Sequence, residues 1–414
     1  MLNKFKPKSE FSRNVLTLMT GTTIAQAIPI AISPILTRLY TPKDFGVFAL
    51  FSVLVYVLAT IANGRYELAI MLPKKDEDAI NLMALGFAIN VVLTITIFII
   101  ILLFNNTILT LLNNSDIKPW LYLIPITVFL VGCFNLLRFF NNRKKEYKDL
   151  AKANVYKSIA MAVVQLFLGF FKAGAIGLIS GQIFSQLVSN AKLFFNIKHL
   201  NLFVKIKKVK MIALAKKYKK FPLYNLPNAL IDGFRMSMIN ILIGKFFSIS
   251  TLGQFSLAWR ITQVPSSLIG NSISQVFFQK VSSSKNSDLQ KIVKNFIVKA
   301  SLVAIPMFLV IYLFAKPIFT FVFGKEWQDA GAVASILAPW LFLNFLTSPL
   351  STIFIKLEKQ QVLLIFGIFY ALVPVLILYY YHFDFLEAIE LITFAMSLML
   401  LIFIALLFYL LKRV

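Results

Sequence analysis

Long apolar segments alternate with short polar connections along almost the whole chain. Most of these segments reach about 20 residues, the length that an α-helix needs to cross about 30 Å of hydrocarbon. Barrel strands would instead alternate apolar and polar residues over about 10 residues. The pattern therefore predicts an all-α polytopic membrane protein with about twelve transmembrane helices. The predicted helices cover residues 14–37, 45–63, 80–104, 119–140, 152–171, 174–196, 222–246, 253–278, 292–315, 329–354, 361–381 and 386–410.

The basic residues gather in alternate connections. With the N-terminus in the cytoplasm, the cytoplasmic segments hold 33 of the 42 Lys and Arg residues and the outer segments hold 7. The positive-inside rule therefore predicts that both termini are cytoplasmic. The same rule explains the net charge of +25, so we expect no nucleic-acid partner. A hydrophobic content of 59% with a mean hydropathy of +0.79 excludes a soluble globular protein.

The longest connection, near residues 197–221, carries eight lysines between His199 and Lys220, among apolar side chains. It is either an amphipathic helix on the anionic inner leaflet or a solvated linker. We expect it to separate an N-terminal six-helix bundle, 1–196, from a C-terminal six-helix bundle, 222–414.

An internal repeat supports two halves. The segment Arg38–Leu50 resembles Lys245–Leu257 at a constant offset of 207, and the offset places Gly46 on Gly253. Because six helices is an even number, both halves start on the same side of the membrane. The repeat is then parallel, and a substrate site is expected between the two bundles.

Catalytic patterns are missing from the sequence. There is no dinucleotide-binding glycine pattern, phosphate-binding loop, HExxH or nucleophile elbow. The single cysteine, Cys133, and two distant histidines, His199 and His382, predict neither a disulfide nor a metal site. The predicted outer loops are short, whereas a membrane glycosyltransferase, polymerase or ligase would need a large one. We therefore expect a transporter without a cofactor.

The seventh and eighth predicted helices, 222–246 and 253–278, carry three charges away from their ends: Asp232, Arg235 and Arg260. Charges at membrane depth cost roughly 2.5–3.5 kcal/mol each, so they are candidates for substrate contact. Asp232 and Arg235 share a helical face, and Asn228 lies one turn earlier. A self-neutralising pair and an outward-reaching Arg260 are the structural alternatives. Two arginines on adjacent helices suit a diphosphate, since guanidinium groups bind phosphate oxygens bidentately.

The other candidates are polar residues near the helix ends or in the first helix. Thr23 and Gln26 lie at mid-depth in the first predicted helix, and their side chains would face the sugars of the substrate. Pro29 and Pro34 should bend this helix. Arg38 and Lys245 are equivalent in the repeat and form either a cationic exit ring or membrane anchors. Arg65 closes the second helix at the inner face, as an anchor or a substrate contact.

Several motifs carry a family resemblance. They are Thr37–Gly46 and Arg65–Pro73, then Tyr218–Tyr224, then Phe323–Trp327 with Ala330-Gly331, Leu337–Pro339 and Ser348–Ser351. On these motifs the chain resembles the Wzx-type O-antigen and polysaccharide flippases. Their superfamily also contains the multidrug MATE exporters and the lipid II flippases.

The resemblance implies a MATE-like fold in a bacterial plasma (inner) membrane. It implies transfer of an undecaprenyl-diphosphate-linked oligosaccharide from the inner to the outer leaflet by alternating access, for O-antigen or other surface polysaccharide synthesis. The partners would be the lipid bilayer and the polysaccharide polymerase and ligase machinery. A coupling ion, H+ or Na+, stays open. The alternatives are a MATE-like exporter of small cationic molecules and a polysaccharide ligase or polymerase.

Overall fold

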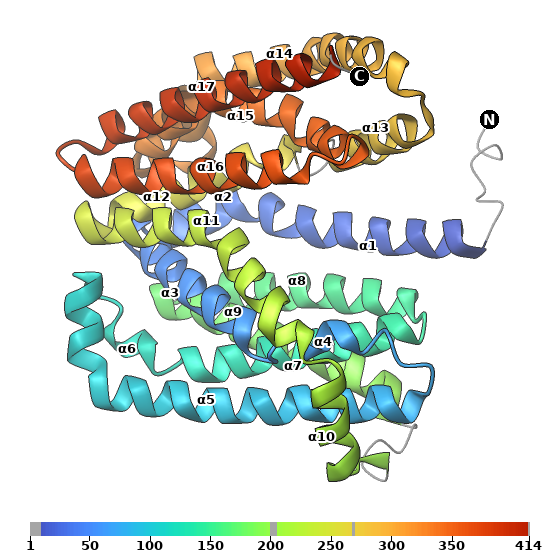
Figure 1. Cartoon of the computed structure of the whole chain (residues 1–414). Coiled ribbons are helices and arrows are strands. Elements are labelled where there is room, and N and C mark those ends of the chain that lie inside the picture. Colours follow the sequence, from blue (N-terminus) through green and yellow to red (C-terminus); the bar gives the residue numbers. More distant parts are fainter. Residues whose placement is uncertain (1–9, 199–204, 267–269, 413–414) are drawn as a thin grey trace, which may run out of the picture. The chain divides into compact units, whose positions relative to one another are not determined.

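The computed structural model describes residues 10–198, 205–266 and 270–412, and the regular elements in this part of the chain are all helical (Figure 1). The predicted all-α class is therefore confirmed. The α-helices are α1 Glu10–Ala31, α2 Ser33–Leu39, α3 Pro42–Ile61, α4 Tyr66–Ala69, α5 Asp76–Leu112, α6 Lys118–Leu121, α7 Ile124–Arg143, α8 Tyr147–Phe170, α9 Ala175–Ile197, α10 Lys208–Lys217, α11 Leu226–Phe246, α12 Ile249–Thr262, α13 Asn271–Ser283, α14 Leu289–Phe323, α15 Gln328–Lys356, α16 Gln360–Tyr380 and α17 Phe385–Leu411. Short π- and 3-10 helices lie at η4 Phe221–Asn225, η6 Asn286–Asp288 and η7 Lys325–Trp327.

Nine helical stretches of the described residues are long and apolar enough to cross a membrane. They are Thr17–Leu39, Pro42–Ile61, Asp76–Leu112, Ile124–Arg143, Tyr147–Phe170, Asn286–Phe323, Lys325–Phe354, Gln360–Tyr380 and Phe385–Leu411. The chain is thus a multi-pass membrane protein. The other three predicted segments coincide with α9, α11 and the pair α12 and α13, which do not meet the same length and hydropathy criteria. The twelve-helix layout and the cytoplasmic termini stay predictions.

The first predicted helix is interrupted, as its prolines suggested. α1 ends at Ala31 and α2 begins at Ser33, immediately before Pro34. A proline inside a helix removes a donor and clashes with the preceding turn. The Ser33 hydroxyl donates to the carbonyl of Pro29 at 2.6 Å. The break therefore separates two consecutive helices, α1 and α2, without a loop between them.

Two compact units make up the chain, Met1–Ser237 and Met238–Val414, and they divide within α11. In the first unit α3 packs against α7 and α9, α7 packs against α5, and α8 packs against α9 and α1. In the second unit α15 is the central helix, because it contacts α14, α17, α12 and α13.

The helices that begin within the two repeated segments, α3 and α12, start at the same offset of 207 residues as the sequence repeat. Thr41 caps α3 in a capping box with Asp44, whose backbone N–H donates to the Thr41 hydroxyl. Ser248 caps α12 by accepting from the Thr251 backbone N–H at 2.9 Å. Residues 41 and 248 are 207 positions apart, and so are the starts of α3 and α12. The shared feature is therefore a hydroxyl-capped helix start.

A second pair of turns shares this offset. α6 begins at Lys118 and contains Trp120, and the short helix η7 contains Lys325 and Trp327. Each pair precedes a helix packed inside its own unit, α7 in the first and α15 in the second. The match extends the repeat beyond the segment that the sequence comparison used.

The basic connection forms a helix, α10, that is docked on the first unit beside the start of α5 (Figure 1). Lys210 Nζ lies 2.7 Å from a carboxylate oxygen of Glu77. Asn81 accepts from the Lys207 backbone N–H at 2.8 Å, and Leu214 is buried. These contacts tie the helix to the first unit, and the choice between the two expectations stays a prediction. Residues 199–204 lie outside the described part.

Candidate functional site

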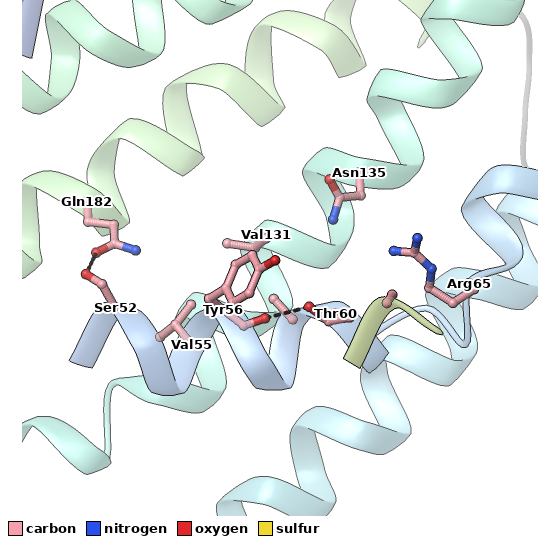
Figure 2. Close-up of a pocket in the computed structure, with 10 residues that line it drawn as sticks. Ser52, Val55, Tyr56, Thr60, Arg65, Val131, Asn135 and Gln182 are labelled. Carbon is pink, nitrogen blue, oxygen red and sulfur yellow. Dashed lines mark hydrogen bonds between the residues drawn. The ribbon is translucent and has the colours of Figure 1, made fainter. Parts of the chain in front are cut away.

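A cavity of about 570 Å³ lies inside the first unit (Figure 2). Its wall combines hydroxyl, amide and guanidinium groups with small apolar side chains. The lining residues are Ser52, Val55, Tyr56, Ala59 and Thr60 from α3, Arg65, Val131 and Asn135 from α7, Gln182 from α9 and Ala229 from α11.

One face of α3 supplies half of this wall. Ser52, Tyr56 and Thr60 are four residues apart, so they project on the same side of the helix. The Ser52 hydroxyl donates to the Gln182 side-chain oxygen at 3.1 Å, and the Thr60 hydroxyl donates to the Tyr56 carbonyl at 2.8 Å. The Tyr56 side chain is 55% exposed. This face offers a phenol ring and polar groups within an otherwise apolar helix.

A strained turn places Arg65 at the end of the cavity. Gly64 and Arg65 have φ values of 58° and 62°, in the left-handed region. A non-glycine residue pays roughly 1–2 kcal/mol for that conformation. Such strain persists where the surroundings hold it, and it is concentrated at functional sites. Figure 2 shows the Arg65 guanidinium and the Asn135 amide facing the same space.

Arg65 is only partly neutralised. Its Nη1 lies 3.5 Å from Glu67 Oε1, and one quarter of its side chain is exposed. Its buried Nε has no hydrogen-bond partner among the described residues. The guanidinium therefore retains donors for a ligand.

Glu67 lies at the start of α4 and is buried. Burial raises the pKa of its carboxyl above the ordinary value, while its own backbone N–H and the charges of Arg65 and Arg138 act in the opposite direction. One of its carboxylate oxygens has no hydrogen-bond partner among the described groups. Burial thus works against the charged form of this carboxyl, and its two basic neighbours favour that form.

Two further cations continue from Arg65. Arg138 follows Asn135 by one turn of α7 and lies within electrostatic range of both Arg65 and Glu67. Lys157 of α8 interacts with Arg138 and lies over the Phe134 ring, with its Nζ 4.5 Å from the ring centroid. Glu67 thus interacts with two of these cations, Arg65 and Arg138, and Lys157 adds a third cation near Arg138. Positive charge exceeds negative charge in this group, which attracts an anion.

The first part of α11 closes another side of the cavity. Ala229 lines it, and Gly233 lies against Tyr56. A Cβ atom on Gly233 would be 2.8 Å from Tyr56 Cε1, too close for ordinary contact. Glycine at this position therefore allows α11 to approach the Tyr56 ring.

Of the predicted site residues, Arg65 lines this cavity. Asn228 is exposed and is not part of the lining. Arg235 follows Ala229 by six residues, which places it about 120° away around α11, on another face. It is half-buried and takes part in interactions of its own. The Asp232 side chain lies outside the described residues, so its pairing with Arg235 stays a prediction.

The remaining predicted residues lie elsewhere. Thr23 and Gln26 are exposed on α1, and Arg38 is exposed near the end of α2. In the second unit, Lys245 lies over the Phe246 ring, and Arg260 is half-buried near the end of α12.

Sequence reasoning missed most of the wall. It did not single out Ser52, Tyr56, Asn135, Gln182, Arg138 or Lys157. The signal was the four-residue spacing of hydroxyl residues in 52–60, within a segment that contains no charge. Among the described residues no cluster of three or more His, Cys, Asp or Glu side chains is suited to a metal ion.

Comparison with known proteins adds relatives of low identity. A probable low-salt glycan biosynthesis flippase of Haloferax volcanii is 34% identical over 113 residues, covering 26% of this chain and 24% of that protein. A succinoglycan biosynthesis transport protein of Rhizobium meliloti is 22% identical over 313 residues, covering 74% of this chain and 61% of that protein. The chain therefore spans less than two thirds of the length of these relatives.

Solved structures share the fold. An inward-facing multidrug resistance MATE family transporter superposes with a TM-score of 0.71 at 15% identity, covering 95% of this chain and 94% of the other. A lipid II flippase in an inward closed conformation superposes with a TM-score of 0.72 at 13% identity, covering 95% and 87%. The fold is thus MATE-like, as the resemblance implied. The family model described as polysaccharide biosynthesis protein matches residues 35–332. Because that match covers well over half of the chain, the protein belongs to the polysaccharide biosynthesis protein family.

Proposed function

We propose that this protein is a flippase that moves an undecaprenyl-diphosphate-linked oligosaccharide across a bacterial plasma membrane by alternating access. The observation that carries the proposal is Arg65 in the wall of the cavity of the first unit, together with the cations Arg138 and Lys157 that continue from it. The family assignment and the flippase names of relatives support the same activity. The product would pass to the polysaccharide polymerase and ligase machinery.

The diphosphate binds at the Arg65 end of the cavity. A guanidinium presents a planar fork that matches two phosphate oxygens, and charge-assisted hydrogen bonds are the strongest of their kind. Arg65 lines the cavity, and one quarter of its side chain is exposed. Arg138 and Lys157 add positive charge near it, and Glu67 is the acidic group that interacts with Arg65 and Arg138.

The sugar next to the diphosphate contacts the α3 face. Hydroxyl and amide groups of Ser52, Asn135 and Gln182 offer both donors and acceptors to sugar hydroxyls. The exposed Tyr56 ring supplies an apolar surface with a polar tip. A volume of about 570 Å³ is in the range of small-ligand sites, about 300–1,000 Å³. A longer oligosaccharide therefore extends outside this cavity, and the polyprenyl chain remains in lipid.

The test is transport in vesicles by Arg65→Gln and Arg138→Gln, at matched protein levels. We expect each to lower the rate by about tenfold or more, since a hydrogen bond to a charged group contributes roughly 1.5–3 kcal/mol. Lys74→Gln is the matched control, because Lys74 is an exposed cation nine positions after Arg65 that does not line the cavity. Normal transport by the Arg65→Gln, Arg138→Gln double variant would refute the site.

Two companion variants test the earlier candidates. Arg235→Ala and Arg260→Ala remove the mid-membrane arginines that the sequence favoured. A loss of transport in either variant, with normal protein levels, would extend the site beyond the first unit. Normal transport in both would leave the diphosphate to Arg65 and its neighbours.

A cationic cargo is disfavoured by the same chemistry. The residues that line the cavity include Arg65 and no carboxylate, whereas binding of a small cation would need an acidic group. Drug resistance on expression, without rescue of a flippase-deficient strain, would reverse this preference. Sugar transfer by the purified protein would instead establish a ligase or polymerase.

A further inference from the structure

A second cavity, of about 500 Å³, lies between α13 and α14 of the second unit. Six of its nine lining residues are apolar, and the polar ones are Lys280, Asn295 and Lys299. Its size is in the range of small-ligand sites, about 300–1,000 Å³. The function proposed for the first unit does not use it.

The cavity is amphipathic because each helix turns a similar face to it. Phe277 and Lys280 are three residues apart on α13, and Phe296 and Lys299 are three apart on α14. The two phenylalanine rings pack together with centroids 4.3 Å apart. One lysine therefore lies about one turn from the aromatic pair on each helix. The wall joins an apolar surface to two ammonium groups.

The lining of this cavity offers no counter-charge to the two ammonium groups. No carboxylate lines the cavity, and among the described residues neither Lys280 nor Lys299 forms an ion pair. The segment 280–299 contains five lysines and one acidic residue, Asp288. Two uncompensated lysines favour an anionic ligand. Lysine acts on phosphate as a compact point charge with three donors.

The cavity also lies at the level where α14 changes from a lysine-rich segment to an apolar one. α14 has 35 residues and is therefore about 52 Å long, well over the roughly 30 Å of a hydrocarbon core. After Lys299 the next charged residue is Lys316. Lys299 thus lies at the edge of the apolar part of the helix, and Val303 of the cavity wall lies one turn deeper. A ligand in such a site can place a phosphate at the lysines and a hydrocarbon chain against the apolar wall.

We propose that this cavity binds an anionic phospholipid of the surrounding bilayer. Lys280 and Lys299 hold the phosphate, and the Asn295 amide donates to the headgroup. One acyl chain lies against Ile273 and Val303. The proposal concerns a resident lipid and does not depend on which molecule the first unit transports. A free phosphate shares the headgroup chemistry but lacks the chain that the apolar wall accommodates.

The test measures lipid retained by the purified full chain, using native mass spectrometry after detergent extraction with equal amounts of phosphatidylglycerol and phosphatidylcholine. We expect the wild type to retain phosphatidylglycerol preferentially. Lys280→Gln, Lys299→Gln should lower that retention by about thirtyfold, since a lysine near a membrane surface changes anionic-lipid binding by about fivefold. Lys291→Gln, Lys294→Gln is the matched control, because both lysines are exposed on α14 and neither lines the cavity.

Two outcomes would overturn the proposal. One is unchanged phosphatidylglycerol retention by the Lys280→Gln, Lys299→Gln variant, or equal losses in the control. The other is displacement of the lipid by millimolar inorganic phosphate, which would assign the site to a free anion. Phosphate that fails to compete, together with weaker retention of short-chain phosphatidylglycerol, supports the lipid. Transport need not be measured, so failure here leaves the proposed flippase function untouched.

Discussion

Arg65 combines a strained backbone conformation with a partly exposed guanidinium group, and mutation can separate the effects of the two. Asparagine tolerates the left-handed conformation better than most residues, so Arg65→Asn should fold with a thermal stability close to the wild type. Its transport should fall by about tenfold or more, because the hydrogen bonds of a charged donor are lost. Thermal unfolding in detergent and vesicle transport measure the two effects.

The matched variant at the preceding residue tests the turn itself. Gly64→Ala adds a Cβ atom at a φ of 58°, and we expect a loss of roughly 1–2 kcal/mol in the free energy of unfolding. An unchanged melting temperature for Gly64→Ala would contradict the strained-turn argument. The Arg65 side chain would then be placed by its surroundings alone.

Glu67 should make stability depend on pH in a defined direction. Burial raises the pKa of its carboxyl above the ordinary 4.5, so the folded state holds a proton that the unfolded state releases as pH rises past 4.5. The unfolding free energy should therefore be highest below 4.5 and fall as pH rises toward the folded pKa. Glu67→Gln should remove this part of the pH dependence. Melting curves from pH 4 to 8 for both proteins check it, and parallel curves would contradict the assignment.

Of the residues that line the cavity, only Arg65 was predicted from the sequence as a site residue. Arg65 is visible in the sequence because a basic residue follows an apolar segment. Ser52, Tyr56 and Gln182 are ordinary polar residues of apolar helices, and their convergence depends on how α3 packs against α9. That packing leaves no local pattern in the sequence. Arg138 was counted among the cytoplasmic charges at the end of the predicted helix 119–140, and α7 continues to Arg143.

At the scale of elements, the docked helix α10 gives the basic connection a structural role. Tyr66 follows Arg65 in the sequence, and its hydroxyl donates to the Ala215 carbonyl at 3.1 Å. Leu214 packs in a core that includes Tyr66 and Ile80. α10 therefore braces the segment that presents Arg65. The lysine-rich composition predicted a surface segment, but the fit of Leu214 into the first unit is a tertiary contact that composition does not reveal.

Leu214→Ala should release α10 from this core. A buried Leu→Ala change typically costs roughly 2–5 kcal/mol, here mainly as local undocking. Trypsin should then cut at the lysines of 205–220 faster than in the wild type. Val209→Ala is the control on the same helix, because Val209 is 81% exposed. Equal cleavage rates for the two variants would show that α10 does not depend on the Leu214 contact.

At the scale of the whole chain, the two halves share turns but not charge. The offset of 207 pairs Arg138 with Phe345 and Lys157 with Leu364. It also pairs Ser52 with Trp259, which packs against Trp340 with ring centroids 5.5 Å apart. The capped helix starts persist in both halves because they fix backbone geometry. The cations Arg65, Arg138 and Lys157 belong to the first half. Placing the anion-binding site in the second half, on the basis of its mid-membrane arginines, therefore requires independent evidence.

The charge of the proposed cargo leads to a prediction about driving force. A diphosphate of about −2 that moves outward across a membrane with an inside-negative potential of about 100 mV gains roughly 4–5 kcal/mol, because the potential drives the anion outward. That value is an upper limit, because the cations that bind the cargo offset its charge if they cross the field with it. We expect net outward transport in vesicles to increase with an inside-negative potential and to fall when the potential is collapsed.

The matched measurement uses a potassium gradient with an ionophore to set the potential, with each direction of gradient applied to the same vesicle preparation. A neutral, dephosphorylated lipid-linked sugar serves as the control and should be insensitive to the potential. Transport of the diphosphate that ignores the potential would mean that protein charge moves with the cargo or that an ion is coupled. Repeating the measurement with Arg138→Gln separates these explanations, because removing a cation that moves with the cargo should restore the dependence on potential.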